Sequence, residues 1–249
     1  MQKRPDAIGI IPARAQSSRF PLKVIAEIRK KPMLQYIWES AKTAKSLSRV
    51  LIATDSEEVA RIARGFGAEA VMTGEFATGS DRVASIAKNL EFPIVVNLQA
   101  DEPTLPSSAI DDLVEALASD PETGMATLAV RMERAEDLQN PNIVKCVFDT
   151  KGRALYFSRQ PIGADSSGKF WKHIGIYAYR KDVLLRLSKM PPSPLEIAER
   201  LEQLRALEDG VRIALRPVVH DTVAVDVPED IFKVESYLAM REGLLESPK

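Results

Sequence analysis

Short apolar runs rich in β-branched residues alternate with segments of helical period along the first half of the chain. The apolar runs predict strands over residues 7–13, 49–55, 69–73 and 93–99. Between them, apolar positions at helical spacing predict helices around Leu34, Ile37, Trp38 and Ala41 and over residues 56–67 and 80–90. Ser80 is the expected N-cap of the third helix. This alternation is typical of βαβ units and predicts an α/β fold with a mainly parallel central sheet.

The pattern changes at about residue 125, where strands follow one another with few helices between them. Alternating apolar runs are separated by turn signals such as "NPN" and "DTKG", and they lie at 125–132, 143–149, 153–159 and 173–180. We therefore expect a single domain spanning 1–249, with an antiparallel insertion lobe at about 125–210 beside the parallel sheet. The remaining patterns predict a helix over 194–207, strands over 211–219 and 222–227, and a closing helix from Pro228.

Composition limits the classes of partner. The 249 residues carry 34 basic and 35 acidic side chains, so no overall positive field favours nucleic acid or an anionic membrane. An anion site must therefore be local. The one cysteine, Cys146, lies in an apolar run, which excludes an internal disulfide and favours a buried residue in a reducing compartment. With no signal peptide or membrane-spanning run recognisable, we expect a cytoplasmic protein.

Three cations crowd the segment "IPARAQSSRFPLKVI", residues 11–25, directly after the first predicted strand. Ligands bind beyond the carboxyl ends of strands in open parallel sheets, so Arg14, Arg19 and Lys23 occupy a favourable place for an anion. Arginine grips phosphate oxygens with two hydrogen bonds and lysine supplies a compact charge. A triphosphate is the expected ligand; the alternative is that these side chains are solvated surface charges.

Two aspartates follow apolar runs and are candidate metal ligands. In "VVNLQADEP" an apolar strand runs directly into Asp101 and Glu102, and a carboxylate at the end of a buried strand is costly unless it is paired or holds a cation. Asp226 stands in "AVDVPED", just before the closing helix, where helix capping is an equal alternative. Capping is the preferred interpretation for Glu229 and Asp230. Oxygen ligands of this kind favour Mg²⁺.

The order of motifs over nearly the whole chain resembles that of the 3-deoxy-manno-octulosonate (Kdo) cytidylyltransferases, also called CMP-Kdo synthetases. The matching segments are "IIPAR" with "SSR-P-K", "ATD", "TGSDR", "NLQADEP", "NPN-VK", "LYFSR", "HIGIYAYR", "SPLE", "LEQLR" and "VDVPED". The first motif is shared by several nucleotidyltransferases, whereas "HIGIYAYR" and the run from "SPLE" to "LEQLR" are specific to the Kdo branch. CMP-sialic acid synthetases are more distantly similar.

The resemblance implies a dimeric enzyme with a Rossmann-like nucleotide-diphosphosugar transferase fold. It implies transfer of CMP from CTP to the anomeric hydroxyl of Kdo, with release of pyrophosphate, for lipopolysaccharide biosynthesis. The nucleotide-side residues it assigns are Arg14 and Lys23 on the triphosphate, Ser17 and Arg19 on the phosphate loop, Arg82 and Gln99 near nucleotide and sugar, and Asp101 and Asp226 on Mg²⁺. The sugar-facing residues it assigns are His173, Tyr177, Glu202 and Gln203. No residue stands out as a general base.

Residue patterns alone leave the sugar-facing assignments open. His173 precedes an alternating strand and could be a satisfied core histidine, although Tyr177 shares its strand face. Glu202 and Gln203 flank the apolar stripe of a charged helix, where a solvated face is the ordinary outcome.

Two positions depart from the family pattern, which usually has glycine where this chain has Leu22 and Ala100. Leu22 disfavours a positive φ in the phosphate loop. The segment before His173 is short and lacks the basic residues expected there, which leaves the acceptor open between Kdo and a relative such as 8-amino-Kdo. A CMP-sialic acid or sugar 1-phosphate nucleotidyltransferase is a rival enzyme, against which "HIGIYAYR" and "LEQLR" argue. A nucleotide-binding module without catalysis is the alternative from another class, and the two candidate metal aspartates argue against it.

Overall fold

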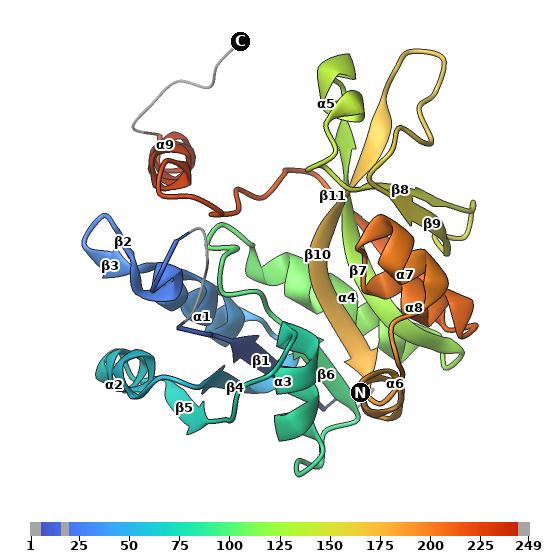
Figure 1. Cartoon of the computed structure of the whole chain (residues 1–249). Helices are drawn as coiled ribbons and strands as arrows, with labels where there is room; N and C mark the ends of the chain where they lie inside the picture. Colours follow the sequence, from blue (N-terminus) through green and yellow to red (C-terminus); the bar gives the residue numbers. More distant parts are fainter. Residues whose placement is uncertain (1–5, 16–19, 244–249) are drawn as a thin grey trace.

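One sheet runs through both halves of the molecule, with parallel strands on the N-terminal side and the antiparallel lobe on the other (Figure 1). The computed structural model describes residues 6–15 and 20–243. The parallel strands pair in the order β6 (Ile94–Asn97), β1 (Ala7–Pro12), β4 (Leu47–Thr54) and β5 (Glu69–Met72). They occupy the four apolar runs of the first half, so the predicted parallel sheet is confirmed.

Helices cover both faces of the sheet. Alternation in β1 sends Ala7 and Ile11 to one face and Ile8 and Ile10 to the other. The first face packs against α1 (Met33–Thr43), α2 (Glu57–Gly65) and α4 (Ser107–Ser119). The second packs against α3 (Gly79–Ala87), α6 (Lys181–Leu187) and α8 (Gln203–Glu208). No helix within residues 6–15 and 20–243 is long and apolar enough to cross a membrane.

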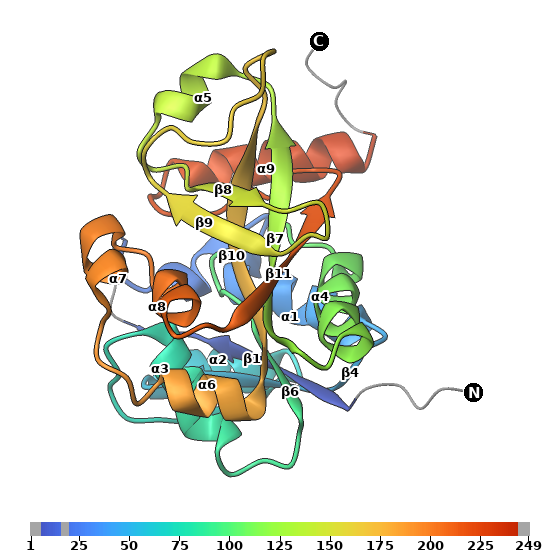
Figure 2. The same ribbon diagram turned by 90° about the vertical axis from the view of Figure 1, so that its right-hand side faces the viewer.

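The antiparallel lobe is organised around β10 (Phe170–Arg180). It pairs with β7 (Thr123–Met132) along most of its length and with β8 (Lys145–Phe148) at Lys172, and its last residues also pair with β6, so that Tyr177 lies opposite Asn97. β10 therefore brings residues of the lobe next to the carboxyl ends of the parallel strands. The lobe is completed by β9 (Ala154–Ser158), α5 (Ala135–Gln139) and α7 (Pro194–Glu199), and by β11 (Arg212–Val218), which joins it by pairing parallel to β7 (Figure 2).

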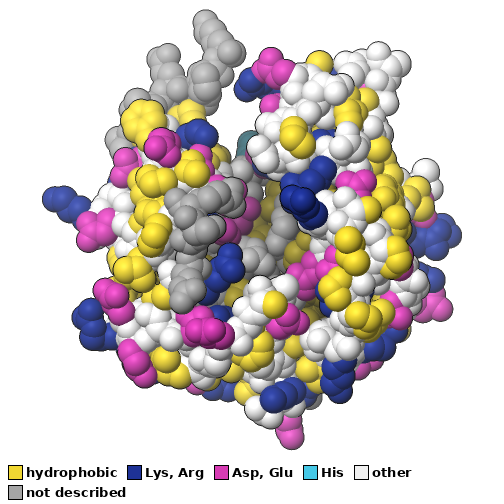
Figure 3. All heavy atoms as spheres, viewed as in Figure 1, with side chains coloured by type: hydrophobic (Ala, Val, Ile, Leu, Met, Phe, Trp, Pro, Cys, Tyr) yellow, Lys and Arg dark blue, Asp and Glu magenta, His cyan; other side chains and the backbone are white. Residues whose placement is uncertain are grey.

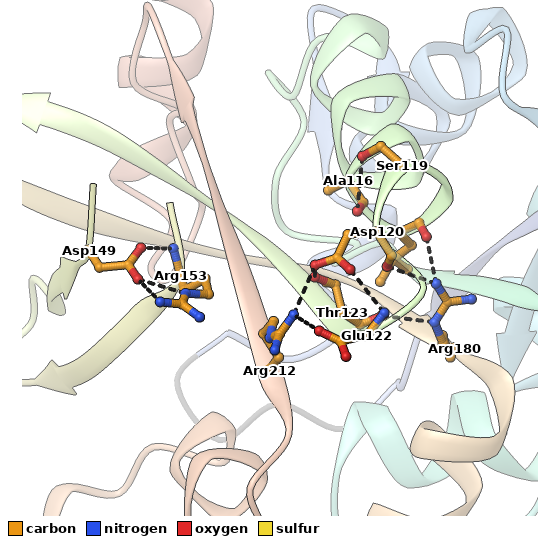
Figure 4. A network of polar contacts seen from close by, with 10 residues as sticks. Ala116, Ser119, Asp120, Glu122, Thr123, Asp149, Arg153, Arg180 and Arg212 are labelled. Atoms are coloured by element: carbon orange, nitrogen blue, oxygen red, sulfur yellow. Dashed lines mark hydrogen bonds and ion pairs between the residues drawn. The ribbon is translucent and has the colours of Figure 1, made fainter. Parts of the chain in front are cut away.

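Polar contacts join the two halves at the turn between α4 and β7 (Figure 4). The Arg180 guanidinium donates to the carbonyl oxygens of Leu117, Asp120 and Thr123 at 2.6–3.0 Å. Arg212, from β11, pairs with Glu122 at 2.6 Å and with Asp120 at 3.4 Å. One turn thus anchors two strands of the lobe.

The long helix expected over 194–207 is broken. Its parts are α7 and α8, and Arg200 between them adopts the left-handed conformation with φ of 56°. Ser193 and Glu196 form a capping box at the start of α7, and the Leu201 amide donates back to the Glu196 carbonyl. The predicted apolar stripe is therefore split: Leu195 is exposed, while Leu201 and Leu204 are buried. The hydrophobic periodicity predicted one continuous helix because the leucines of both segments lie at helical spacing.

Three further local expectations were wrong. Residues 222–227 form no strand, although Val225 donates to the Asp101 carbonyl at 2.9 Å and its side chain packs with Ile28, Met33 and Val234. This small cluster lies beneath α9 (Asp230–Arg241) and explains the apolar alternation. Thr78, not Ser80, caps α3 by accepting from the Asp81 amide, because Thr78 is still extended while Ser80 is already helical. Asp230 lies in the first turn of α9, where an acid is favourable to the helix dipole, but its carboxylate accepts from the amides of Asp226 and Val227, which precede the helix. The N-cap, Glu229, makes no side-chain cap hydrogen bond, so the expected side-chain capping by these two acids does not occur.

Candidate active site

A cleft of about 340 Å³ opens above the carboxyl ends of β1 and β6, and we call it the cationic cleft. The molecule is hollowed between its two halves on this face (Figure 3). The cleft is lined by the first turn of α3, by the segment that follows β6, and by the segment that precedes α9. Its charged and amide side chains are Arg14, Lys23, Arg82, Gln99, Asp101 and Asp226.

Lys23 lies between the two candidate metal aspartates. Its ammonium is 2.7 Å from an Asp101 carboxylate oxygen and 3.8 Å from one of Asp226. It also donates to the Val225 carbonyl at 2.7 Å, so the short helix η1 (Lys23–Ile25) is tied to the segment before α9. The Asp101–Val225 backbone hydrogen bond holds the same two segments together. Two carboxylates from distant parts of the chain therefore converge on one position for a cation.

This arrangement suits a magnesium ion that shares its ligands with phosphate groups. No cluster of three or more His, Cys, Asp or Glu side chains suited to a metal occurs in the part of the chain that the structure describes. Mg²⁺ is commonly bound by one or two carboxylates together with substrate phosphates and water. Asp101 and Asp226 provide two carboxylates, with Arg14 and Lys23 beside them for the phosphate charge.

Beside this cleft lies a second cavity of about 320 Å³, the arginine hollow, between Arg14 and Arg82. The Arg82 guanidinium is 3% exposed and donates to Asp55 at 2.5 Å and to the Thr73 hydroxyl. Asp55 also accepts from the Ala15 amide at 3.2 Å. Burial acts to raise the pKa of Asp55, but these hydrogen bonds and the Arg82 charge outweigh it, so the pKa is lowered. Asp55 therefore stays ionised and fixes both Arg82 and the backbone after β1.

Two more hollows continue from the cationic cleft into the lobe. The tyrosine hollow, about 190 Å³, shares Gly79 and Gln99 with the cationic cleft. The histidine hollow, about 310 Å³, shares Tyr177 and Gln203 with the tyrosine hollow. The Tyr177 hydroxyl donates to the Gln203 amide oxygen at 3.1 Å, at the point where these two hollows meet. A continuous series of cavities thus leads from the cations to the lobe.

His173 is buried and uncharged in the histidine hollow. Its Nε2 is 2.9 Å from the Thr127 hydroxyl, whose oxygen is also close to the carbonyls of Ile174 and Ile176. Carbonyls only accept, so a hydroxyl proton directed to one of them leaves the hydroxyl oxygen to accept from His173 Nε2–H, and in that tautomer Nδ1 is an acceptor. Burial, with a smaller contribution from Lys172, lowers the pKa of His173 to about 3.

Two glutamates near these hollows are shielded from water. Burial raises the pKa of Glu202, in the tyrosine hollow, although a hydrogen bond with Ser80 opposes the shift. Burial and the neighbouring charge of Asp101 raise the pKa of Glu102, in the histidine hollow, to about 7. The break after α7 lets Glu202 face the hollow rather than solvent.

Comparison with known proteins places these features in a family. A family model described as "Cytidylyltransferase" matches residues 8–213. The chain belongs to this cytidylyltransferase family. It is 43% identical over 241 residues to the 3-deoxy-manno-octulosonate cytidylyltransferase of Geobacter sulfurreducens, covering 91% of this chain and 96% of the relative. It is 48% identical over 243 residues to the enzyme of the same name from Syntrophobacter fumaroxidans, covering 93% and 96%.

Solved structures agree with the fold of this cytidylyltransferase. A CMP:2-keto-3-deoxy-manno-octonic acid synthetase complexed with CTP superposes with a TM-score of 0.90 at 37% identity, covering 95% of this chain and 99% of the other. The 4-diphosphocytidyl-2C-methyl-D-erythritol synthase of Anaerococcus prevotii, at 12% identity, has a TM-score of 0.65 and covers 95% and 99%. The second likeness supports only the Rossmann-like nucleotidyltransferase fold.

The structure brings together most residues that the sequence singled out. The cationic cleft contains six of them, as given above, and the tyrosine and histidine hollows contain the sugar-facing set His173, Tyr177, Glu202 and Gln203. Ser17 and Arg19 lie outside the described residues. Leu22 adopts the positive φ that its side chain disfavours, at 54°, so the loop keeps the backbone shape for which a glycine is usual.

The sequence patterns assigned no role to Asp55, Thr73 or Glu102. Asp55 follows β4, the neighbour of β1 in the parallel sheet, so the rule that ligands bind at carboxyl strand ends could have found it. Thr73 lies just after β5 and follows the same rule. Glu102 was noted beside Asp101, but nothing in the pattern showed that the two side chains line different cavities.

Proposed function

We propose that the protein transfers CMP from CTP to the anomeric hydroxyl of 3-deoxy-D-manno-octulosonate, giving CMP-Kdo and pyrophosphate for lipopolysaccharide biosynthesis. The observation that carries the proposal is the pairing of two sites. A cationic cleft with two converging carboxylates opens through Gln99 into hollows lined by hydrogen-bonding side chains, among them Tyr177, Glu202 and Gln203. One site suits a triphosphate and the other a polyhydroxylated acceptor, in a chain 43–48% identical to enzymes that bear this name.

In this proposal the protein acts mainly by positioning. Arg14 and Lys23 bind the outer phosphates and neutralise the charge that develops on the departing pyrophosphate. Arg82, fixed by Asp55, lines both the cationic cleft and the arginine hollow and orients the nucleotide. The anomeric oxygen forms a bond to the α-phosphorus while the bond to the pyrophosphate oxygen breaks. Holding the reactants in line removes much of the entropic barrier.

We propose that Asp101 and Asp226 hold Mg²⁺. When bound, the ion supplies charge stabilisation on the phosphates and lowers the pKa of a coordinated hydroxyl. Replacing either aspartate by asparagine should reduce turnover by orders of magnitude and remove the dependence of CTP affinity on Mg²⁺. Near-normal turnover of either variant at saturating Mg²⁺ would assign that aspartate to capping or surface charge.

The acceptor is assigned to the two lobe hollows. His173, Tyr177, Glu202 and Gln203 offer both donors and acceptors for a hydroxylated sugar acid. A related 2-keto sugar acid, such as 8-amino-Kdo or a sialic acid, is the second candidate substrate. The hollows suit any of these acids, and the choice of Kdo among them rests on the names of the relatives.

A pyrophosphate-release assay with CTP, Mg²⁺ and a panel of 2-keto sugar acids tests the proposal. We expect release that depends on Kdo and exceeds that with the other acids. Preference for another acid would change the substrate, and no release with any acid would leave only a nucleotide-binding module.

We also propose a cytoplasmic homodimer. The lone cysteine, Cys146, is buried, which suits a reducing compartment. For the dimer surface, Leu155 on β9 and Ile197 on α7 are 61% and 66% exposed. These two elements are neighbours, because Glu199 accepts from the Ser158 hydroxyl at 2.8 Å (Figure 2). Sedimentation should show a dimer that Ile197→Glu converts to monomer; a monomeric parent protein would contradict this.

A further inference from the structure

Two buried polar atoms share one cavity. In the part of the chain that the structure describes, the buried side-chain atoms without a hydrogen-bond partner are one carboxyl oxygen of Glu102, Oε2, and the amide nitrogen of Gln203, Nε2. Both residues line the histidine hollow. Buried polar groups in proteins are almost always hydrogen bonded, so an exception needs an explanation. A donor and an acceptor left without partners around one cavity are explained by a polar ligand that pairs with both.

Consecutive acids of the "DEP" turn are directed to different cavities. Asp101 lines the cationic cleft and pairs with Lys23, whereas Glu102 lines the histidine hollow. The turn is held by the Glu102 amide, which donates to the Gln99 carbonyl at 3.2 Å, and by the Asp101–Val225 backbone bond. A rigid turn thus presents one carboxyl group to each substrate site.

The other charges around the histidine hollow are already paired. Lys172 contacts both carboxylate oxygens of Asp221, at 2.9 and 2.7 Å. Glu102 itself hydrogen bonds with Thr222. Its second oxygen therefore remains for a neutral hydrogen-bonding partner rather than for a cation of the protein.

We propose that Glu102 is a specificity-determining residue that hydrogen bonds a hydroxyl of the acceptor sugar, on the part of the molecule away from the anomeric carbon. The inference rests on the proposed function. The anomeric oxygen must reach the α-phosphorus in the cationic cleft, and the cationic cleft and the histidine hollow share no lining residue. A sugar group in the histidine hollow is therefore remote from the reacting carbon. Gln203, which is common to both lobe hollows, donates to the same acceptor.

The test compares Glu102→Ala and Glu102→Gln with wild type, with the exposed Glu115→Ala on α4 as matched control. KM for Kdo, KM for CTP, kcat and thermal midpoint are measured on the same preparations. Glu102→Ala should raise KM for Kdo by about ten- to hundredfold with little change in KM for CTP, as expected when a hydrogen bond to a charged group is lost. Glu102→Gln keeps a hydrogen-bonding group of the same shape and should retain most of the affinity. The thermal midpoint of ligand-free Glu102→Gln should stay close to wild type, whereas Glu102→Ala also loses the hydrogen bond with Thr222 and its midpoint should fall slightly.

Singly deoxygenated acceptors locate the contact. Removing the hydroxyl that Glu102 binds should raise the KM of wild type for the acceptor by about tenfold or more. The same removal should hardly change the KM of Glu102→Ala, because the residue and the hydroxyl are coupled. Unchanged KM for Kdo in Glu102→Ala, or no coupling with any hydroxyl away from the anomeric carbon, overturns the inference. Equal losses for CTP and Kdo with a lower thermal midpoint also overturn it and assign Glu102 to structure. If wild type turns over another sugar acid but not Kdo, the proposed substrate is wrong, but the role of Glu102 is not yet contradicted. The variants are then compared with wild type on that other acid.

Discussion

At the scale of single residues, the charged groups of the site hold one another in position through ion pairs. Lys23 contacts both candidate metal aspartates, and Asp55 holds Arg82 in place. A lysine between two carboxylates lowers the electrostatic cost of bringing them together. The same cation is within the cleft that suits a triphosphate. We therefore expect the proposed phosphate binding and metal binding to be coupled through Lys23.

Outer-phosphate contacts can be tested by comparing two nucleotides. Lys23→Ala and Arg14→Ala should each lower the binding affinity for CTP by about ten- to hundredfold, since a charge-assisted contact contributes about 1.5–3 kcal/mol. Binding of CMP, which lacks the outer phosphates, should change little. Calorimetry with both nucleotides checks this, with the exposed Lys88→Ala as control. Equal losses for CTP and CMP would show that the two cations act on another part of the nucleotide.

His173 makes a pH-dependent contribution to stability. Its pKa is about 3 when folded and about 6.5 when unfolded, so between these values only the unfolded chain takes up the proton. Stability should therefore fall as the pH drops below about 6.5, by about 1.4 kcal/mol per pH unit. Urea unfolding of wild type and His173→Gln at pH 7.5 and 5.5 measures this contribution of His173. Glu102 has a raised pKa, which acts in the opposite direction, but its effect is the same in both proteins and cancels in the comparison. Equal pH slopes for the two proteins would mean that His173 titrates normally.

At the scale of elements, sequence periodicity located strands better than it located helix ends. Strands β1, β4, β5 and β6 could be predicted from apolar runs, because parallel strands buried on both faces appear in a sequence as nearly continuous hydrophobic segments. The break at Arg200 could not be predicted, since it depends on a capping box and on tertiary burial of Leu201. Residues 222–227 alternate like a strand but bury Val225 in a separate cluster. The candidate site was predicted residue by residue from motifs, whereas its division into connected hollows needed the fold.

The break at Arg200 makes a prediction about stability. A left-handed backbone costs a non-glycine residue about 1–2 kcal/mol, and glycine adopts it freely but loses about 0.5–1 kcal/mol more entropy on folding. Arg200→Gly should therefore raise the free energy of unfolding by up to about 1.5 kcal/mol. Arg61→Gly, at an exposed position inside α2, should instead lower it by about 1 kcal/mol. Urea titration compares the two; a loss in both would mean that the Arg200 side chain contributes more than its backbone strain costs.

At the scale of the whole molecule, one sheet carries two sites. The parallel half presents the cationic cleft at its strand ends, and β10 brings the lobe beside it by pairing with β6. The hollows of the lobe open from the cleft through Gly79 and Gln99. The two substrates are thus expected to contact different halves and to meet at Gln99.

This division predicts which kinetic constant each half controls. His173→Ala and Glu202→Ala should raise KM for the sugar acid and leave CTP affinity close to wild type, because both residues line lobe hollows and neither lines the cationic cleft. The two losses should be non-additive in the double variant if both side chains contact one bound sugar. Steady-state kinetics, CTP calorimetry and thermal midpoints on the same preparations separate the outcomes. A lower midpoint for His173→Ala with an unchanged sugar KM would show that the histidine serves the core through Thr127, and the acceptor would then be held by Glu202 and the residues around Gln203.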